Sequence, residues 1–153
     1  MGREGGDASG SGAVLLAVPQ TAIPDALASV DGLEGVPVID AVNAVRGPRP
    51  EGFESLAEYV KSLTGGPVAK AFNANFAALY DEVKKQRSKP GCLFAADPDA
   101  REVTEQLIRD AGFEPVSVSG LENARALEDF VPNLFAKIEA GRTFYRFAPP
   151  GEL

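Results

Sequence analysis

The sequence predicts an α/β fold, in which a mainly parallel sheet of about five strands is flanked by helices. Five short apolar segments alternate along the chain with segments of helical periodicity, and breakers such as Pro19, Asn43 and the Gly65-Gly66 pair separate them. A length of 153 residues is enough for one such domain and too short for two of ordinary size. The alternation favours parallel strands, because each helix carries the chain back across the sheet.

The predicted strands are apolar along their whole length, which is typical of strands buried on both faces. They comprise residues 13–18, 36–41, 67–72, 92–96 and 113–118. The helices between them are predicted at 22–33, 53–63, 76–83, 97–112 and 119–141.

Three features locate the later helices. Asp97 followed by Pro98 indicates a helix start, with an N-cap and a proline at the first helical position. Ser119 and Glu122 have the spacing of a capping box, and Pro132 is expected to bend or divide the last helix. Arg125 and Glu128 are spaced to pair on one helix face.

The two ends of the chain differ in composition from the predicted domain at 13–141. Residues 1–12 are rich in glycine, serine and charge, which predicts a flexible tail. Residues 142–153 form an aromatic and proline-rich C-terminal tail that could cover a pocket, join a partner or pack on the sheet.

Charge and cysteine content narrow the class of protein. A net charge of −7 argues against binding to nucleic acid or to an anionic membrane. The basic residues at 84–89 are interpreted as a solvated helix end rather than an anion site. One cysteine, Cys92, and no apolar leader favour a cytoplasmic protein with a buried, inert thiol.

The chain contains no histidine, which excludes Ser-His and Cys-His nucleophile pairs and most zinc sites, so no metal site is expected. Hydride transfer between two stacked cofactors remains possible because it depends on ring alignment more than on a side-chain base. In parallel sheets ligands bind at the carboxyl ends of the strands. Those ends are predicted at residues 17–19, 40–43, 71–73 and 96–97.

Six segments occur in the order and at the spacing found in the NADPH-dependent deazaflavin (coenzyme F-420) reductases. They are LLAVP at 15–19, VIDAVN at 38–43, AKAFN at 69–73, LFAADPDAREV at 93–103, GFEPVSVSGL at 112–121 and ARALE at 124–128. The chain therefore resembles this family and, more loosely, the 6-phosphogluconate dehydrogenase and pyrroline-5-carboxylate reductase superfamily of NADP-binding proteins. The resemblance implies a Rossmann-like fold and hydride transfer between NADPH and a deazaflavin or similar small-molecule acceptor.

The resemblance also implies site residues. Its cofactor-binding positions are Ala17, Val18, Pro19, Asn43, Phe72 and Asn73, and its catalytic positions are Lys70 and Asn73. Each has a simpler reading from composition alone: the asparagines as turn residues, Lys70 as a lysine that extends to water, and Phe72 as core.

The family begins with a strand, a G-x-G-x-x-G turn and a helix, and nothing before residue 13 matches this first βαβ unit. The glycine turn grips the pyrophosphate, so the domain is expected to be a truncated member or one whose gene start lies upstream. The strand at 13–18 should then have an unpaired edge. The alternative function is a non-catalytic module that pairs through this edge with itself or with a full-length reductase.

Overall fold

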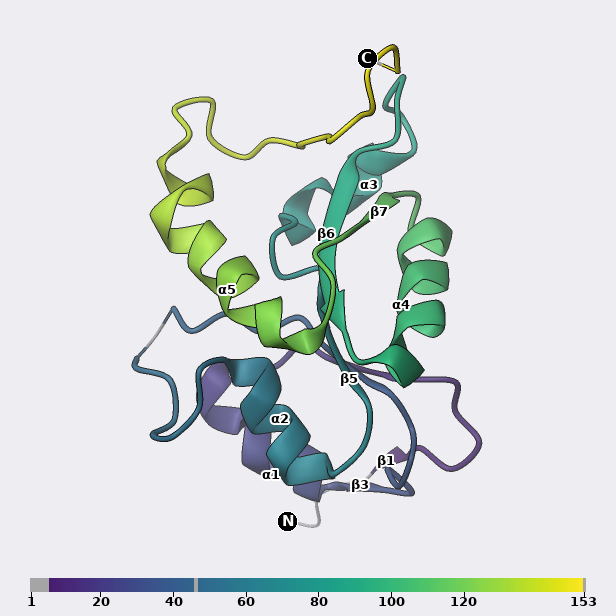
Figure 1. Ribbon diagram of the computed structural model, residues 1–153, viewed down its shortest axis with the longest axis vertical. Coiled ribbons are helices and arrows are strands. Elements are labelled where there is room, and N and C mark those ends of the chain that lie inside the picture. The colour runs from purple at the N-terminus through teal and green to yellow at the C-terminus, as the bar shows by residue number, and fades with distance from the viewer. Residues whose placement is uncertain (1–5, 46, 153) are drawn as a thin grey trace.

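The computed structural model describes residues 6–45 and 47–152, and it consists of a twisted five-stranded sheet with helices on both faces (Figure 1). The strand order is β2-β4-β5-β6-β7. Their bounds are Val14–Leu16, Val38–Asp40, Val68–Ala71, Gly91–Ala96 and Glu114–Ser117. Three of the four strand pairings are parallel, which confirms the predicted α/β class and the mainly parallel sheet.

Strand β6 is the exception, because it runs antiparallel to β5 with Ala69 opposite Ala96 and Ala71 opposite Phe94. The connection between these strands holds only η2 (Ala77–Leu79) and α3 (Tyr80–Val83), and it stays at one end of the sheet. Residues 72–90 do not return to the other end of the sheet, so β6 begins where β5 ends and runs back beside it, whereas a parallel pair needs a crossover. The prediction that residues 96–97 join the other strand ends is therefore wrong, since they lie at the opposite end.

The sheet divides the core into two layers, and helices cover each of them. On one face lie α1 (Ile23–Ala28), α2 (Leu56–Thr64) and α5 (Ala124–Asn133), and on the other lies α4 (Pro98–Asp110) (Figure 1). The first layer buries Leu27, Val38, Leu56, Val60, Val68 and Leu127. The second buries Ile39, Ala69, Phe94, Ile108 and Phe113.

The last helix begins later than predicted. Ser119 adopts a φ of 76° and its side chain caps nothing, so the expected capping box is absent from this helix start. A single turn, η3 (Leu121–Asn123), precedes α5, and Pro132 lies in the final turn of α5. Beyond it, η4 (Phe135–Lys137) continues as a separate turn.

The N-terminal segment differs from the predicted flexible tail. Within its described part, β1 (Gly6–Asp7) pairs in parallel with β3 (Val30–Asp31), and Ala8 is buried. Residues 1–5 lie outside the described residues. Backbone pairing and one buried side chain thus hold a segment whose composition indicates little apolar content.

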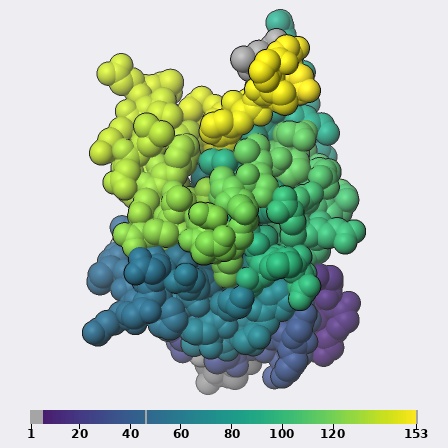
Figure 2. All heavy atoms as spheres, viewed as in Figure 1, coloured from purple at the N-terminus to yellow at the C-terminus, as the bar shows by residue number. Residues whose placement is uncertain are grey.

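The C-terminal tail packs against the sheet through Tyr145. The Tyr145 carbonyl accepts a hydrogen bond from Gly91 N at 2.7 Å, and its hydroxyl accepts one from Leu93 N at 3.0 Å. Figure 2 shows the tail, in yellow, on the outer surface of the molecule. Among the described residues, no helix has the length and apolar character needed to cross a bilayer.

Candidate functional site

The carboxyl ends of β2, β4 and β5 meet at one end of the sheet. Their register places Leu16 opposite Asp40 and Asp40 opposite Lys70. The chain beyond β4 and β5 brings Asn43 and Asn73 together: Asn43 Nδ2 donates to the Asn73 carbonyl at 2.7 Å, and Asn73 Nδ2 donates to Asn43 Oδ1 at 2.9 Å. Two asparagines 30 positions apart in the sequence thus form one amide pair.

Two adjoining hollows open at this end and share three lining residues, Ala17, Ala41 and Asn43. The smaller, of about 380 Å³, is also lined by Val18, Pro19, Gln20, Val42 and Val45. The larger, of about 560 Å³, is also lined by Leu15, Phe72, Asn73, Asn75, Ala77, Tyr80, Leu107, Asp110 and Ala111. Together they form what we call the strand-end crevice. Every residue expected to bind the cofactor lines it.

Asn73 lines the crevice and carries a buried acceptor without a partner among the described residues. The residue is 6% exposed, and its Nδ2 also donates to the Leu127 carbonyl at 3.0 Å. Its buried Oδ1 has no hydrogen-bond partner among the described residues. Because burial of an unpaired acceptor costs stability, such an atom in a hollow is a candidate ligand contact.

Phe72, at the end of β5, has a strained backbone. Its φ is 62°, in the left-handed region that a bulky aromatic residue rarely adopts. Strain of this kind persists where the surrounding structure imposes it, and it is frequent at functional sites. The ring of Phe72 is half-buried and lines the larger hollow, so it is not simply part of the core.

Lys70 lies beneath the crevice and does not line it. Its side chain is 0% exposed, so it does not extend to water. The ammonium donates to the Val42 carbonyl at 2.6 Å and pairs with Asp40 Oδ2 at 2.6 Å and Glu128 Oε1 at 3.0 Å. We call Asp40, Lys70 and Glu128 the buried charge cluster.

Glu128 ties this cluster to three other segments. Its Oε1 accepts hydrogen bonds from Leu56 N at 2.8 Å and Ala57 N at 3.4 Å, at the start of α2. Its Oε2 pairs with Arg49 Nε at 2.8 Å. The predicted pairing of Arg125 with Glu128 is wrong, because Arg125 pairs with Asp129 and Glu54 and leaves Glu128 to the interior.

Burial raises the pKa of Asp40, and the positive charge of Lys70 opposes that shift. Asp40 also accepts a hydrogen bond from Val42 N at 2.8 Å. Both backbone groups of Val42 are therefore held: its N–H donates to Asp40 and its carbonyl accepts from Lys70. Val42 directly precedes Asn43, so the buried charge cluster fixes the backbone beside Asn43, which lines the crevice.

Sequence patterns did not indicate three features of the site. Tyr80, within the predicted helix at 76–83, is 38% exposed and lines the larger hollow. Burial raises the pKa of Tyr80 to about 12, so its hydroxyl stays protonated at neutral pH. Asp40 and Glu128 carry no motif of their own, and only the fold brings them to Lys70. Cys92 is buried as expected, and burial raises its pKa to about 12.

Comparison with known proteins gives a likeness at the level of structure. No protein-family model matches the chain, and no curated protein matches it. A hypothetical protein from Sinorhizobium meliloti shares 32% sequence identity over 74% of this chain, with a TM-score of 0.65. The chain spans 58% of the length of that protein.

A second solved structure, from Arthrobacter sp. FB24, is provisionally named as an F-420-dependent NADP reductase. It has a TM-score of 0.72 and 17% identity, with coverage of 93% of this chain and 72% of that one. At this identity the likeness shows the fold, which is Rossmann-like as expected. It supports the resemblance to the deazaflavin reductases at the level of fold.

Proposed function

We propose that the chain supplies the nicotinamide-binding part of an NADP-dependent oxidoreductase, which transfers hydride between NADPH and a deazaflavin such as coenzyme F-420 or a similar flat acceptor. The observation that carries the proposal is the Asn43–Asn73 amide pair in the strand-end crevice, with Asn73 Oδ1 unpaired. The Rossmann-like fold, shared with a protein named as such a reductase, supports it.

The residues present fit a nicotinamide ring. A carboxamide donates two hydrogen bonds, and Asn73 Oδ1 is a buried acceptor without a partner. Leu15, Phe72 and Leu107 give the larger hollow an apolar wall, which would exclude water from a bound ring. A bound reduced nicotinamide supplies the hydride, while the protein supplies orientation and dryness.

Within this proposal the residues have distinct roles. Ala17, Val18 and Pro19 form the wall at the end of β2, and Asn43 and Asn73 hold the carboxamide edge. Lys70 is a positioning residue rather than one that touches substrate, because its ammonium is fully buried and bonded to the Val42 carbonyl.

Binding of reduced nicotinamide riboside tests the proposal directly. This probe carries the ring without a phosphate or the adenylate half, so it does not depend on a glycine turn for the pyrophosphate. Its fluorescence should change saturably on titration with the full chain. Asn73→Ala should weaken binding about tenfold, which corresponds to one lost hydrogen bond to a buried group.

Asn133→Ala is the matched control, because Asn133 is an exposed asparagine on α5 outside the crevice. Its affinity for the probe should equal that of the unchanged chain. A chain that binds no probe, or an Asn73→Ala variant that binds as well as the control, would reject the proposal.

A second function, pairing through the sheet edge, rests on β2. This strand lies at the end of the five-stranded sheet, and its outer side pairs with no other described strand. Leu15 on β2 is 56% exposed. An uncovered apolar edge strand favours pairing with another strand, and we propose a second copy of this chain as the partner.

Light scattering after size-exclusion chromatography distinguishes this function. The unchanged chain should elute as a dimer, and Leu15→Lys should elute as a monomer because a charge on the edge strand opposes pairing. Leu63→Lys, at another exposed leucine on α2, should remain dimeric. A monomeric unchanged chain would refute edge pairing without affecting the hydride-transfer proposal.

A further inference from the structure

The segment directly after α3 carries four basic residues within six positions, in a chain of net charge −7. They are Lys84, Lys85, Arg87 and Lys89. Helix α3 ends at Val83 with Lys84 as its C-cap, so Lys84 lies at the exposed helix end that the spacing predicts and the other three residues lie on the exposed turn beyond it. A turn allows the side chains to surround a ligand from several directions.

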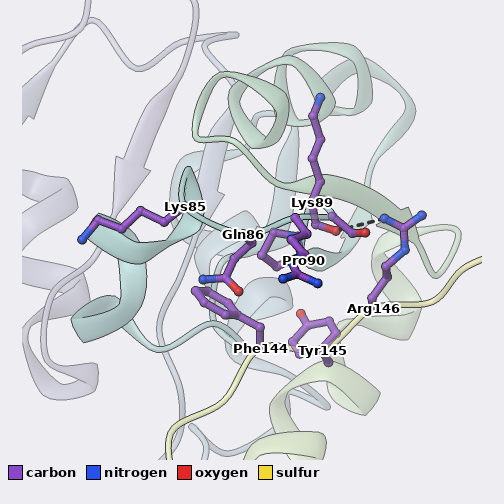
Figure 3. A pocket seen from close by; sticks show the side chains of 9 residues that line it. Lys85, Gln86, Lys89, Pro90, Phe144, Tyr145 and Arg146 are labelled. Atoms are coloured by element: carbon purple, nitrogen blue, oxygen red, sulfur yellow. Dashed lines mark hydrogen bonds between the residues drawn. The ribbon is translucent and has the colours of Figure 1, made fainter. Parts of the chain in front are cut away.

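The C-terminal tail adds a wall to this turn. Residues 85–90 and 144–146 enclose a hollow of about 570 Å³, shown in Figure 3. Pro90 forms a buried part of it, and Phe144 and Tyr145 contribute half-buried rings. Backbone bonding of Tyr145 to Gly91 fixes the tail in this place. Two segments more than 50 residues apart in the sequence thus build one basic, ring-lined hollow.

Arg146 is placed in this hollow by contacts that leave part of its guanidinium unused. Its Nη1 donates to the Lys89 carbonyl at 3.5 Å and its Nη2 to the Glu152 carbonyl at 3.2 Å. Its buried Nε has no partner among the described residues. The contact with the Glu152 carboxylate is long, at 3.9 Å. Arg146 therefore keeps donor capacity and positive charge for an anion.

The other cations are also weakly neutralised. Lys85 pairs with Glu82 at 2.7 Å, and both side chains are largely exposed. Within the described part of the chain, no ion pair is recorded for Arg87 or Lys89. Figure 3 shows Gln86 above the Phe144 ring, with Lys85 and Lys89 extending outward.

We propose that this hollow is a binding site for a phosphate ester that bears a flat ring, of the nucleotide class. The phosphate lies between Arg87 and Arg146, with Lys89 beside it, since guanidinium groups bind phosphate oxygens in pairs. The ring lies against Phe144 in the place of Gln86. The site is separate from the strand-end crevice, although Asn75 lines the crevice and also bonds Tyr145 and Gly91.

Adenosine 5′-monophosphate, adenosine and inorganic phosphate are the probes, titrated into the full chain by calorimetry at low salt. The nucleotide should bind more tightly than inorganic phosphate, because the ring adds a contact, and adenosine should not bind measurably. Arg87→Gln should weaken nucleotide binding about tenfold, the expected loss of one charge-assisted contact. Arg146→Gln should have a similar effect.

Arg101→Gln, on α4, is the matched control, because it removes the same charge from an exposed arginine outside the hollow. Arg87 is exposed and forms no ion pair with any residue that the structure describes, so Arg87→Gln should keep the circular dichroism spectrum of the unchanged chain. Equal weakening in Arg87→Gln and Arg101→Gln would indicate a general charge effect and overturn the site. So would equal affinity for the nucleotide and inorganic phosphate, or no nucleotide binding.

The crevice variant separates this site from the proposed function. Asn73→Ala should leave adenosine monophosphate binding unchanged while weakening binding of reduced nicotinamide riboside, which has no phosphate for the basic hollow. If Asn73→Ala impaired both ligands equally, the two hollows would form one site and the present assignment would be wrong.

Discussion

Two groups of ion pairs in this chain use the same kinds of side chain but differ in burial. Asp40, Lys70 and Glu128 are fully enclosed at the strand ends. On α4, Glu105 pairs with Arg101 and Arg109 at the surface, where the arginine side chains are 49% and 48% exposed. Solvent screens the charges of the second group. In the first group each buried charge needs its partner, because an unpaired buried charge is strongly destabilising. The burial of an ion pair, more than the number of pairs, therefore decides how strongly it holds the backbone around it in place.

Removal of Lys70 should give the largest effect. Lys70→Met leaves Asp40 buried without a cation and leaves Glu128 with Arg49 alone, which should lower the free energy of unfolding by about 3 to 5 kcal/mol. Chemical denaturation measures the change. If Lys70→Met destabilised the chain no more than the loss of an α4 surface pair, burial would not distinguish the two groups. The interior would then relax around the missing charge.

The strained backbone of Phe72 should give the next largest effect. Glycine adopts a positive φ without penalty, so Phe72→Gly should be more stable than Phe72→Ala by about 1 kcal/mol, even though both variants lose the ring. Denaturation of the two variants side by side isolates the backbone term. Equal stability would show that this turn relaxes once the ring is absent.

The surface pairs of α4 should have a smaller effect that depends on salt. Glu105→Gln removes both i,i+4 partners and should cost about 0.5 kcal/mol at low ionic strength. In 1 M salt the Debye length is about 3 Å, so salt screens these surface pairs and the difference in stability from the unchanged chain should vanish. If Glu105→Gln remained less stable than the unchanged chain at high salt, these pairs would be shielded from solvent in the same way as the buried charge cluster.

Asp129 should give the smallest effect and one that depends on pH. Burial would raise its pKa, but hydrogen bonds from Arg49 and Arg125 outweigh burial and lower it below 3.8. A lowered pKa means that the stabilisation is present above pH 3.8 and fades as the pH falls through the folded-state value. The stability difference between the unchanged chain and Asp129→Asn, about 0.3 kcal/mol at pH 7, should shrink in acid.

Much of the fold could be predicted from local pattern. The continuous apolar runs located all five strands of the sheet, and Pro98 located the start of α4. The direction of β6 could not be predicted, because residues 72–90 between β5 and β6 carry a helical pattern that is indistinguishable from that of a crossover helix. The ordered segment at 6–12 was missed for a similar reason, since its pairing with β3 uses backbone groups that every residue has.

The sequence by itself determined the α/β class, the apolar strands and the asparagines that follow β4 and β5, because periodicity and breakers act over neighbouring residues. Only the tertiary structure decided that Asn43 meets Asn73, that Lys70 is enclosed by Asp40 and Glu128, and that Arg146 joins the turn at 85–89. These contacts join segments 30 or more residues apart, and strand register sets one of them, the Asp40–Lys70 pair. Their energy depends on burial, which no single stretch of sequence specifies.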